Sequence, residues 1–160
     1  MRKIMTADRT IVLKAQSKDT ALSFKEKVEI ARLLESAKVD VVEFPAIENE
    51  KIDTLLLKTV CAFLKNSIMS VCTGMTEDGV DAAWNAVSNA AKPRLSVALP
   101  LSPVQMEYVC HKKAPKMLEL IKTLITKASS LCSDVEFVAL DATRAENDVL
   151  ISTIKTAISA

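Results

Sequence analysis

The sequence predicts an α/β fold: a parallel sheet of about five strands connected by helices. Short apolar runs, several of them rich in β-branched residues, alternate along the 160 residues with segments whose apolar residues repeat at helical spacing. The apolar runs are mostly continuous, which is typical of parallel strands covered on both faces. This alternation favours right-handed crossovers, and we expect residues 1–160 to form a single domain.

Five short runs are predicted to be strands. They are Thr10–Leu13, Val39–Phe44, Ile68–Cys72, Arg94–Leu99 and Val135–Leu140.

The segments between these runs carry helix signals. Ser23–Glu26 is a capping box, in which the serine accepts from first-turn amides and the glutamate reaches back. The apolar residues that follow it at helical spacing should face the sheet: Phe24, Val28, Ala31, Leu34 and Ala37.

Four further helices are expected. The second spans about Glu50–Lys65, and acids after Thr76 suit the N-terminus of the third. Pro115 suits the first turn of the fourth, and Thr143–Glu146 reads as a capping box that opens the last.

Composition excludes several classes of function. Charges nearly cancel, with 21 basic and 20 acidic residues, so no electrostatic pattern suggests nucleic acid or a membrane surface as partner. No apolar run approaches the roughly 18 residues of a membrane span, and the first ten residues lack the apolar core of a signal peptide. We therefore expect a cytoplasmic protein. With Gly74 and Gly79 as the only glycines, a glycine-rich phosphate loop is disfavoured.

The four cysteines show no close metal-ligand spacing, and we expect them to be reduced and mainly buried. Cys110 and His111 are adjacent, but neighbours in sequence rarely face each other. The pair is therefore interpreted as structural rather than as a nucleophile and its base.

Four blocks in order carry a family resemblance: Glu26–Pro45, Asp78–Val87, Lys92–Tyr108 and Val135–Arg144. Together they make the chain resemble the 2-isopropylmalate and homocitrate synthases, which are HMG-CoA lyase-like TIM barrels. The resemblance covers essentially the whole chain and implies a partial TIM barrel, equivalent to the first five βα units of eight. Five units cannot close the usual barrel, so the sheet should be open or closed by a partner.

The resemblance also shows where the chemistry departs. The family's first strand ends in the motif Asp-Thr-Thr-Leu-Arg-Asp-Gly-Glu-Gln. In the family, the arginine of this motif polarises the 2-oxo acid, the second aspartate binds a divalent metal, and the glutamate is catalytic. Here those three positions hold Val12, Leu13 and Ala15.

Later motif positions differ as well. Ser96 and Gln105 replace histidines, and Leu140 replaces an acid. The family's His-x-His ligands fall outside these 160 residues. We therefore expect no metal or acetyl-CoA cofactor.

Six residues follow the predicted strand ends, where parallel sheets gather their ligands, and are candidates for substrate binding. They are Glu43, Ser102, Gln105, Asp141, Thr143 and Arg144. Four of them have a structural alternative: Glu43 can satisfy loop amides, Thr143 can cap a helix, and Asp141 with Arg144 can form a loop ion pair.

The main hypothesis is a catalytically inactive relative that acts as a small-molecule-binding module, for example for a 2-oxo acid, or as an assembly module. One alternative is the N-terminal portion of an acyltransferase completed by other segments or chains, and another is an enzyme of different mechanism. Exposed sheet edges and the flank with Ile151, Ile154 and Ile158 predict a homo-oligomer or a related barrel protein as partner. A monomeric, flavodoxin-like packing with helices on both faces is the competing arrangement.

Overall fold

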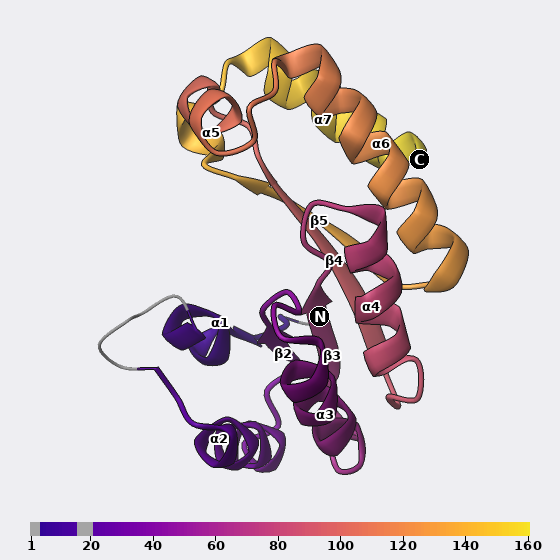
Figure 1. Cartoon of the computed structure of the whole chain (residues 1–160). Coiled ribbons are helices and arrows are strands. Elements are labelled where there is room, and N and C mark those ends of the chain that lie inside the picture. Colours follow the sequence, from indigo (N-terminus) through magenta and orange to yellow (C-terminus); the bar gives the residue numbers. More distant parts are fainter. Residues whose placement is uncertain (1–3, 16–20) are drawn as a thin grey trace.

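The computed structural model describes residues 4–15 and 21–160, and Figure 1 shows their arrangement. The sheet has five strands: β1 (Ala7–Asp8), β2 (Val41–Phe44), β3 (Ile68–Cys72), β4 (Pro93–Pro100) and β5 (Val135–Leu140). Every neighbouring pair is parallel, and the strands follow one another in chain order. This order is that of a half-barrel, which confirms the partial TIM-barrel prediction.

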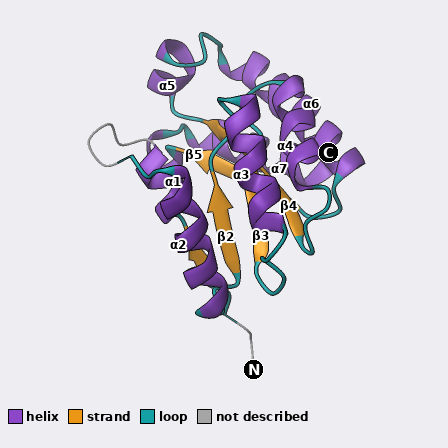
Figure 2. Cartoon of the chain, turned by 60° about the horizontal axis from the view of Figure 1, so that its bottom comes forward, coloured by secondary structure: helices purple, strands orange, loops and turns teal. Residues whose placement is uncertain are grey.

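Helices cover one face of the sheet (Figures 1 and 2). Those on this convex face are α2 (Phe24–Ser36), α3 (Glu50–Cys61), α4 (Glu77–Val87), α6 (Ala114–Leu131) and α7 (Asn147–Ser159). Each of them contacts the next. Two short helices, α1 (Thr10–Ala15) and α5 (Pro103–Tyr108), follow β1 and β4, and a 3₁₀ turn (Ala142–Arg144) follows β5. The flavodoxin-like alternative is therefore wrong, because its helices would lie on both faces.

Successive side chains along each strand point to opposite faces of the sheet, so they enter two different environments. One set joins the apolar core under the helices: Val42, Met69, Val71, Leu95, Val97 and Leu99. The alternate side chains face the concave side, where the register places Glu43 beside Ser70 and Ser70 beside Arg94. The concave side is therefore the more polar one.

Several local signals are confirmed. Ser23 and Glu26 form both bonds of the capping box, the Ser23 Oγ accepting from the Glu26 amide at 3.3 Å and a Glu26 carboxylate oxygen accepting from the Ser23 amide at 2.7 Å. Thr76 caps α4, and Pro115 lies in the first turn of α6. Strands β3 and β5 have the predicted bounds. These features depend on neighbours in sequence, which is why the sequence predicts them well.

The first predicted strand, Thr10–Leu13, is wrong. The strand is the shorter β1, and α1 occupies the predicted segment. The Asp8 carboxylate accepts from the Thr10 amide at 2.9 Å and from the Thr10 hydroxyl at 3.2 Å, which turns the chain out of the sheet. Ile11 and Val12 are nevertheless buried, because one face of α1 packs onto the fold.

Three helix predictions also need correction. Thr143–Glu146 is not a capping box: Thr143 lies in the 3₁₀ turn, and Glu146 precedes α7 without a side-chain cap. Helix α3 ends at Cys61 rather than Lys65. In α2, Phe24 is exposed, as is Ala37 just after the helix, so the face toward the sheet is narrower than predicted.

The four cysteines are unpaired, with Cys61 and Cys132 buried and Cys72 and Cys110 half-buried. Among the described residues, no helix is both long enough and apolar enough to cross a membrane.

Candidate functional site

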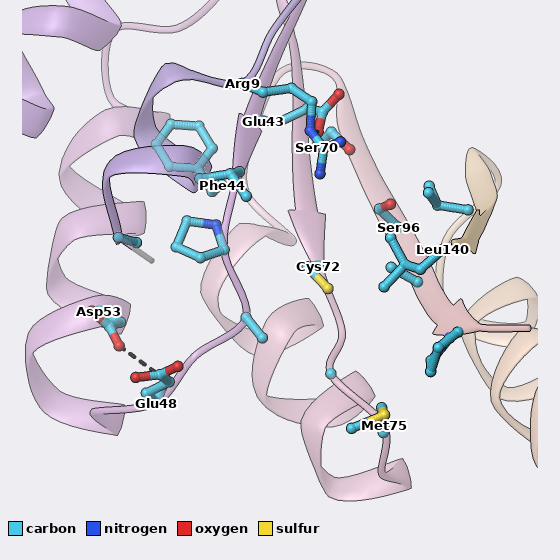
Figure 3. Close-up of a pocket in the computed structure, with 18 of the residues that line it drawn as sticks. Arg9, Glu43, Phe44, Glu48, Asp53, Ser70, Cys72, Met75, Ser96 and Leu140 are labelled. Carbon is cyan, nitrogen blue, oxygen red and sulfur yellow. Dashed lines mark hydrogen bonds and ion pairs between the residues drawn. The ribbon is translucent and has the colours of Figure 1, made fainter. Parts of the chain in front are cut away.

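A cavity of about 480 Å³ lies on the concave side of the sheet (Figure 3). Its walls come from the β1–α1 segment, from alternate residues of β2 to β5, and from the loops that follow the strands. The carboxyl ends of parallel strands are where ligands bind in such folds. The cavity is therefore the best-placed candidate site.

An ion pair lies at this cavity. The Arg9 Nε is 2.8 Å from a Glu43 carboxylate oxygen, and the side chain of Arg9 is 49% exposed while that of Glu43 is 23% exposed. Burial raises the pKa of Glu43 above its ordinary value, although the neighbouring Arg9 acts in the opposite direction. Arg9 thus offsets part of the cost of burying the Glu43 carboxylate.

Ser70 lies next to this pair, on β3. It is 1% exposed, and its hydroxyl has no hydrogen-bond partner among the described residues. Its register partner on β2 is Glu43, and Figure 3 shows the Arg9 side chain reaching toward both residues. Buried polar groups are nearly always hydrogen-bonded, so an unpartnered hydroxyl in a cavity wall calls for an explanation.

Arg94, on β4, is a second charged residue on the concave side and is the register partner of Ser70. The Arg94 Nε is 2.9 Å from a carboxylate oxygen of Asp134, and its Nη1 is 3.7 Å from one of Glu136. Glu136 in turn acts to raise the pKa of Glu43, and Arg94 to lower it. Charges on the concave side are therefore linked across β2, β4 and β5.

The rest of the wall is largely apolar. Val12 and Ala15 contribute from α1, Ala98 from β4, and Val138 and Leu140 from β5. These side chains can contact hydrocarbon but offer no hydrogen bond or charge. The cavity therefore combines the polar corner of Arg9, Glu43 and Ser70 with much aliphatic lining, and further polar side chains line it elsewhere: Lys27, Glu48, Asp53, Ser96 and Gln105.

The six sequence-predicted candidates do not form one cluster. Glu43 and Gln105 line the cavity. Ser102 is buried as the N-cap of α5, where its Oγ accepts from the Gln105 amide at 3.3 Å.

The other three candidates lie in the turn after β5. Asp141 and Arg144 form an ion pair with a 2.6 Å contact, and Thr143 is exposed between them. The Arg144 guanidinium, and then the Ser102 hydroxyl, lower the pKa of Asp141. Asp141 adopts a left-handed backbone conformation with φ of 54°, which this pairing helps to hold.

Sequence reasoning missed Arg9 and Ser70. A period-two reading of β3 would have placed Ser70 and Cys72 on one face, and both line the cavity. Nothing local marks Arg9, because its contact with Glu43 forms between distant segments.

The Cys110–His111 pair lies elsewhere. The Cys110 Sγ is 3.7 Å from the Met75 Sδ, and burial raises the pKa of the thiol. His111 borders a different cavity, between α5, α6 and the start of α7. A raised pKa disfavours the thiolate that a nucleophile needs.

The residues at the family's catalytic positions do not fit a divalent metal. Val12, Ala15 and Leu140 line the cavity without an oxygen ligand, and Leu13 is exposed. Across residues 4–15 and 21–160, no group of three or more His, Cys, Asp or Glu side chains could hold a metal ion.

Comparison with known proteins identifies the family to which this chain belongs. The family model described as HMGL-like matches residues 15–160. This chain belongs to the HMGL-like family. Similar proteins include the 2-isopropylmalate synthase of Nitratidesulfovibrio vulgaris, which is 32% identical over 99% of this chain and 31% of its own length. The 2-isopropylmalate synthase of Pyrococcus abyssi is 30% identical over 100% of this chain and 33% of its own length.

A plant relative extends the comparison. Methylthioalkylmalate synthase 1-1 of Eutrema japonicum is 30% identical over 96% of this chain and 32% of its own length. The HMGL-like chain thus spans about a third of the length of these curated relatives.

Proposed function

We propose that this HMGL-like chain does not catalyse the metal-dependent condensation of its relatives and instead binds a small organic acid in the concave cavity. The observation that carries the proposal is the apolar lining at Val12, Ala15 and Leu140, beside the polar corner of Arg9, Glu43 and Ser70. The cavity thus has polar groups that can bind a ligand, whereas apolar residues occupy these three positions, to which the resemblance assigns catalytic groups.

The magnitude of the loss supports this proposal. Removing one group that stabilises a developing charge costs about 10²–10³ in rate. Valine and leucine can neither polarise a carbonyl nor ligate a hard cation. Several such replacements together leave condensation by this chain negligible.

The dimensions of the cavity support binding of a small molecule. Ligand pockets typically measure roughly 300–1,000 Å³ and combine apolar walls with a few polar groups. The concave cavity, at about 480 Å³, lies within this range.

Two assays test the proposal. We expect no release of free CoA from acetyl-CoA with 2-oxoisovalerate, 2-oxoglutarate or pyruvate, with or without Mg²⁺ or Mn²⁺. We expect a thermal-shift screen of small organic acids to give a rise in melting temperature, because a ligand that binds the native state stabilises it. Metal-dependent turnover that is lost in Glu43→Gln would contradict the first part, and a screen without any stabilising acid would contradict the second.

Assembly is a second candidate function, favoured by the flank of the half-barrel. Ile151, Ile154 and Ile158 on α7 are 51%, 42% and 81% exposed. Grouped apolar side chains on a surface often mark an interface, and β5 is an edge strand of the sheet. A second copy of this chain, or a related barrel protein, could cover this flank. The alternative hypothesis is an acyltransferase that other segments or chains complete. In that case Val12 and Leu13 would still stand where the family has its arginine and aspartate.

A further inference from the structure

We propose that Arg9 and Ser70 form a carboxylate-binding subsite, and that the cavity takes an aliphatic monocarboxylate without needing a 2-oxo group. This inference rests on the proposed function, because it assumes that the cavity binds a small acid. It adds the residues that recognise the acid and the class of acid that they select.

The first argument is the orphaned hydroxyl of Ser70. It is buried in the wall of the cavity without a partner among the described residues, although its neighbours on β2 and β4 are charged. The Ser70 side chain borders the cavity, and a small movement of its buried hydroxyl would let it donate to an oxygen atom that enters there. Such a bond would satisfy a group whose desolvation is otherwise uncompensated.

The second argument is the geometry of Arg9. A guanidinium carries five N–H donors, and the ion pair with Glu43 is made through Nε. Its Nη groups can bind a second carboxylate, since arginine recognises carboxylates through paired donors. Figure 3 shows Arg9, Glu43 and Ser70 converging at one corner of the cavity. Arg9 and Ser70 therefore offer donors to the same incoming oxyanion.

The third argument is the wall that the rest of the ligand would meet. Ala98, Val138 and Leu140 line the cavity with aliphatic surface. A hydrocarbon chain gains from this contact, whereas a 2-oxo group finds no charged partner at Val12. The wall therefore favours a plain aliphatic acid at least as much as the corresponding 2-oxo acid.

Calorimetric titration with matched probes tests the inference. The probes are 3-methylbutanoate, its uncharged amide 3-methylbutanamide, and 3-methyl-2-oxobutanoate. We expect 3-methylbutanoate to bind at least as tightly as the 2-oxo acid and at least about tenfold more tightly than the amide, because a charge-assisted bond is lost with the charge.

Variants of the two residues complete the test. Arg9→Gln should weaken binding of 3-methylbutanoate by about 10- to 100-fold, and Ser70→Ala by about 5- to 10-fold. Two controls should change affinity by less than about twofold. Lys25→Gln removes an exposed positive charge on α2, and Thr153→Val removes a buried hydroxyl on α7 that has no partner among the described residues.

The outcomes separate this inference from the proposed function. Binding of the amide as tight as that of the acid, or affinity for the acid unchanged in both Arg9→Gln and Ser70→Ala, would overturn the subsite. Tighter binding of the 2-oxo acid than of 3-methylbutanoate would overturn the ligand class. In each case binding by the cavity and the absence of condensation would still stand. If no small acid binds at all, the binding proposal and the inference fail together.

Discussion

Arg9 and Glu43 join two segments that lie 34 residues apart, through a 2.8 Å contact between Nε and a carboxylate oxygen. The resemblance places the family's arginine at Val12, three residues after Arg9 in this chain. A cation is thus present at the cavity, but from a different position of the β1–α1 segment and already engaged by a carboxylate. Under the proposed function, this cation binds the carboxylate of a small acid rather than polarising a substrate carbonyl.

The charge of Glu43 should control binding of an acid. Burial raises its pKa, Arg9 and Arg94 act to lower it, and Glu136 acts to raise it. A protonated Glu43 releases Arg9 and no longer repels a carboxylate, so affinity for 3-methylbutanoate should increase as pH falls toward the raised pKa. Below about pH 5 the ligand itself begins to protonate, and affinity should fall again. Titrations between pH 5 and 8 measure this trend.

Glu43→Gln provides the matched variant. It should bind 3-methylbutanoate several-fold more tightly at pH 7 and with a flatter pH dependence, because the neutral amide leaves Arg9 available. Glu48→Gln removes another acid from the cavity lining and should keep the pH dependence of the parent chain. A weaker affinity in Glu43→Gln would show that Glu43 assists the ligand rather than competing with it.

Two buried hydroxyls should be costly to the folded state. Ser70 and Thr153 are fully buried, and neither side-chain oxygen has a partner among the described residues. Ser70→Ala and Thr153→Val should each raise the free energy of unfolding by about 1 kcal/mol, as measured by urea denaturation. Ser67→Ala is the control: the Ser67 hydroxyl donates to the Val39 carbonyl at 2.6 Å, so its loss should lower stability by a similar amount. A lower stability in both test variants would mean that these hydroxyls are satisfied.

Glu35 should make stability depend on pH in acid. Burial acts against its ionisation, but the amides of Asn66, Ser67 and Lys65 outweigh this and lower its pKa to about 2. Because the folded-state pKa lies below that of the unfolded chain, the stabilisation is present above about pH 4.5 and is lost as pH falls toward 2.

Replacing Glu35 tests this contribution. Glu35→Gln should lower the free energy of unfolding at pH 7 by about 2 kcal/mol, less than the full pKa shift implies because the carboxylate is partly exposed. The difference from the parent chain should shrink below about pH 4. Glu29→Gln, an exposed change on the same helix, should have little effect. A difference that stays constant from pH 7 to pH 3 would contradict this account.

The α7 flank should mediate self-association. We expect light scattering at micromolar concentration to give the mass of a dimer or higher oligomer, because Ile151, Ile154 and Ile158 are exposed together. Ile154→Glu should shift the protein toward a monomer, since a charge would be buried in the interface. Ile52→Glu, at a similarly exposed isoleucine on α3, should leave the mass unchanged. A monomeric parent chain would remove the assembly candidate.

The sequence alone determined the features that arise between near neighbours. The capping box of Ser23 and Glu26, the cap at Thr76 and the bounds of β3 and β5 depend on residues within one turn or one strand. The family resemblance extends along the chain, and it correctly implied the half-barrel order of the strands.

Only the tertiary structure decided which face of each element is used. Thr10–Leu13 has strand-like composition, yet Asp8 diverts it into a helix, and burial is satisfied equally well by one face of α1. Arg9, Glu43 and Ser70 come from three segments, and only the parallel register of β2 and β3 and the turn after β1 bring them to one corner. A contact of this kind depends on the positions of distant backbones, which no local pattern of residues encodes.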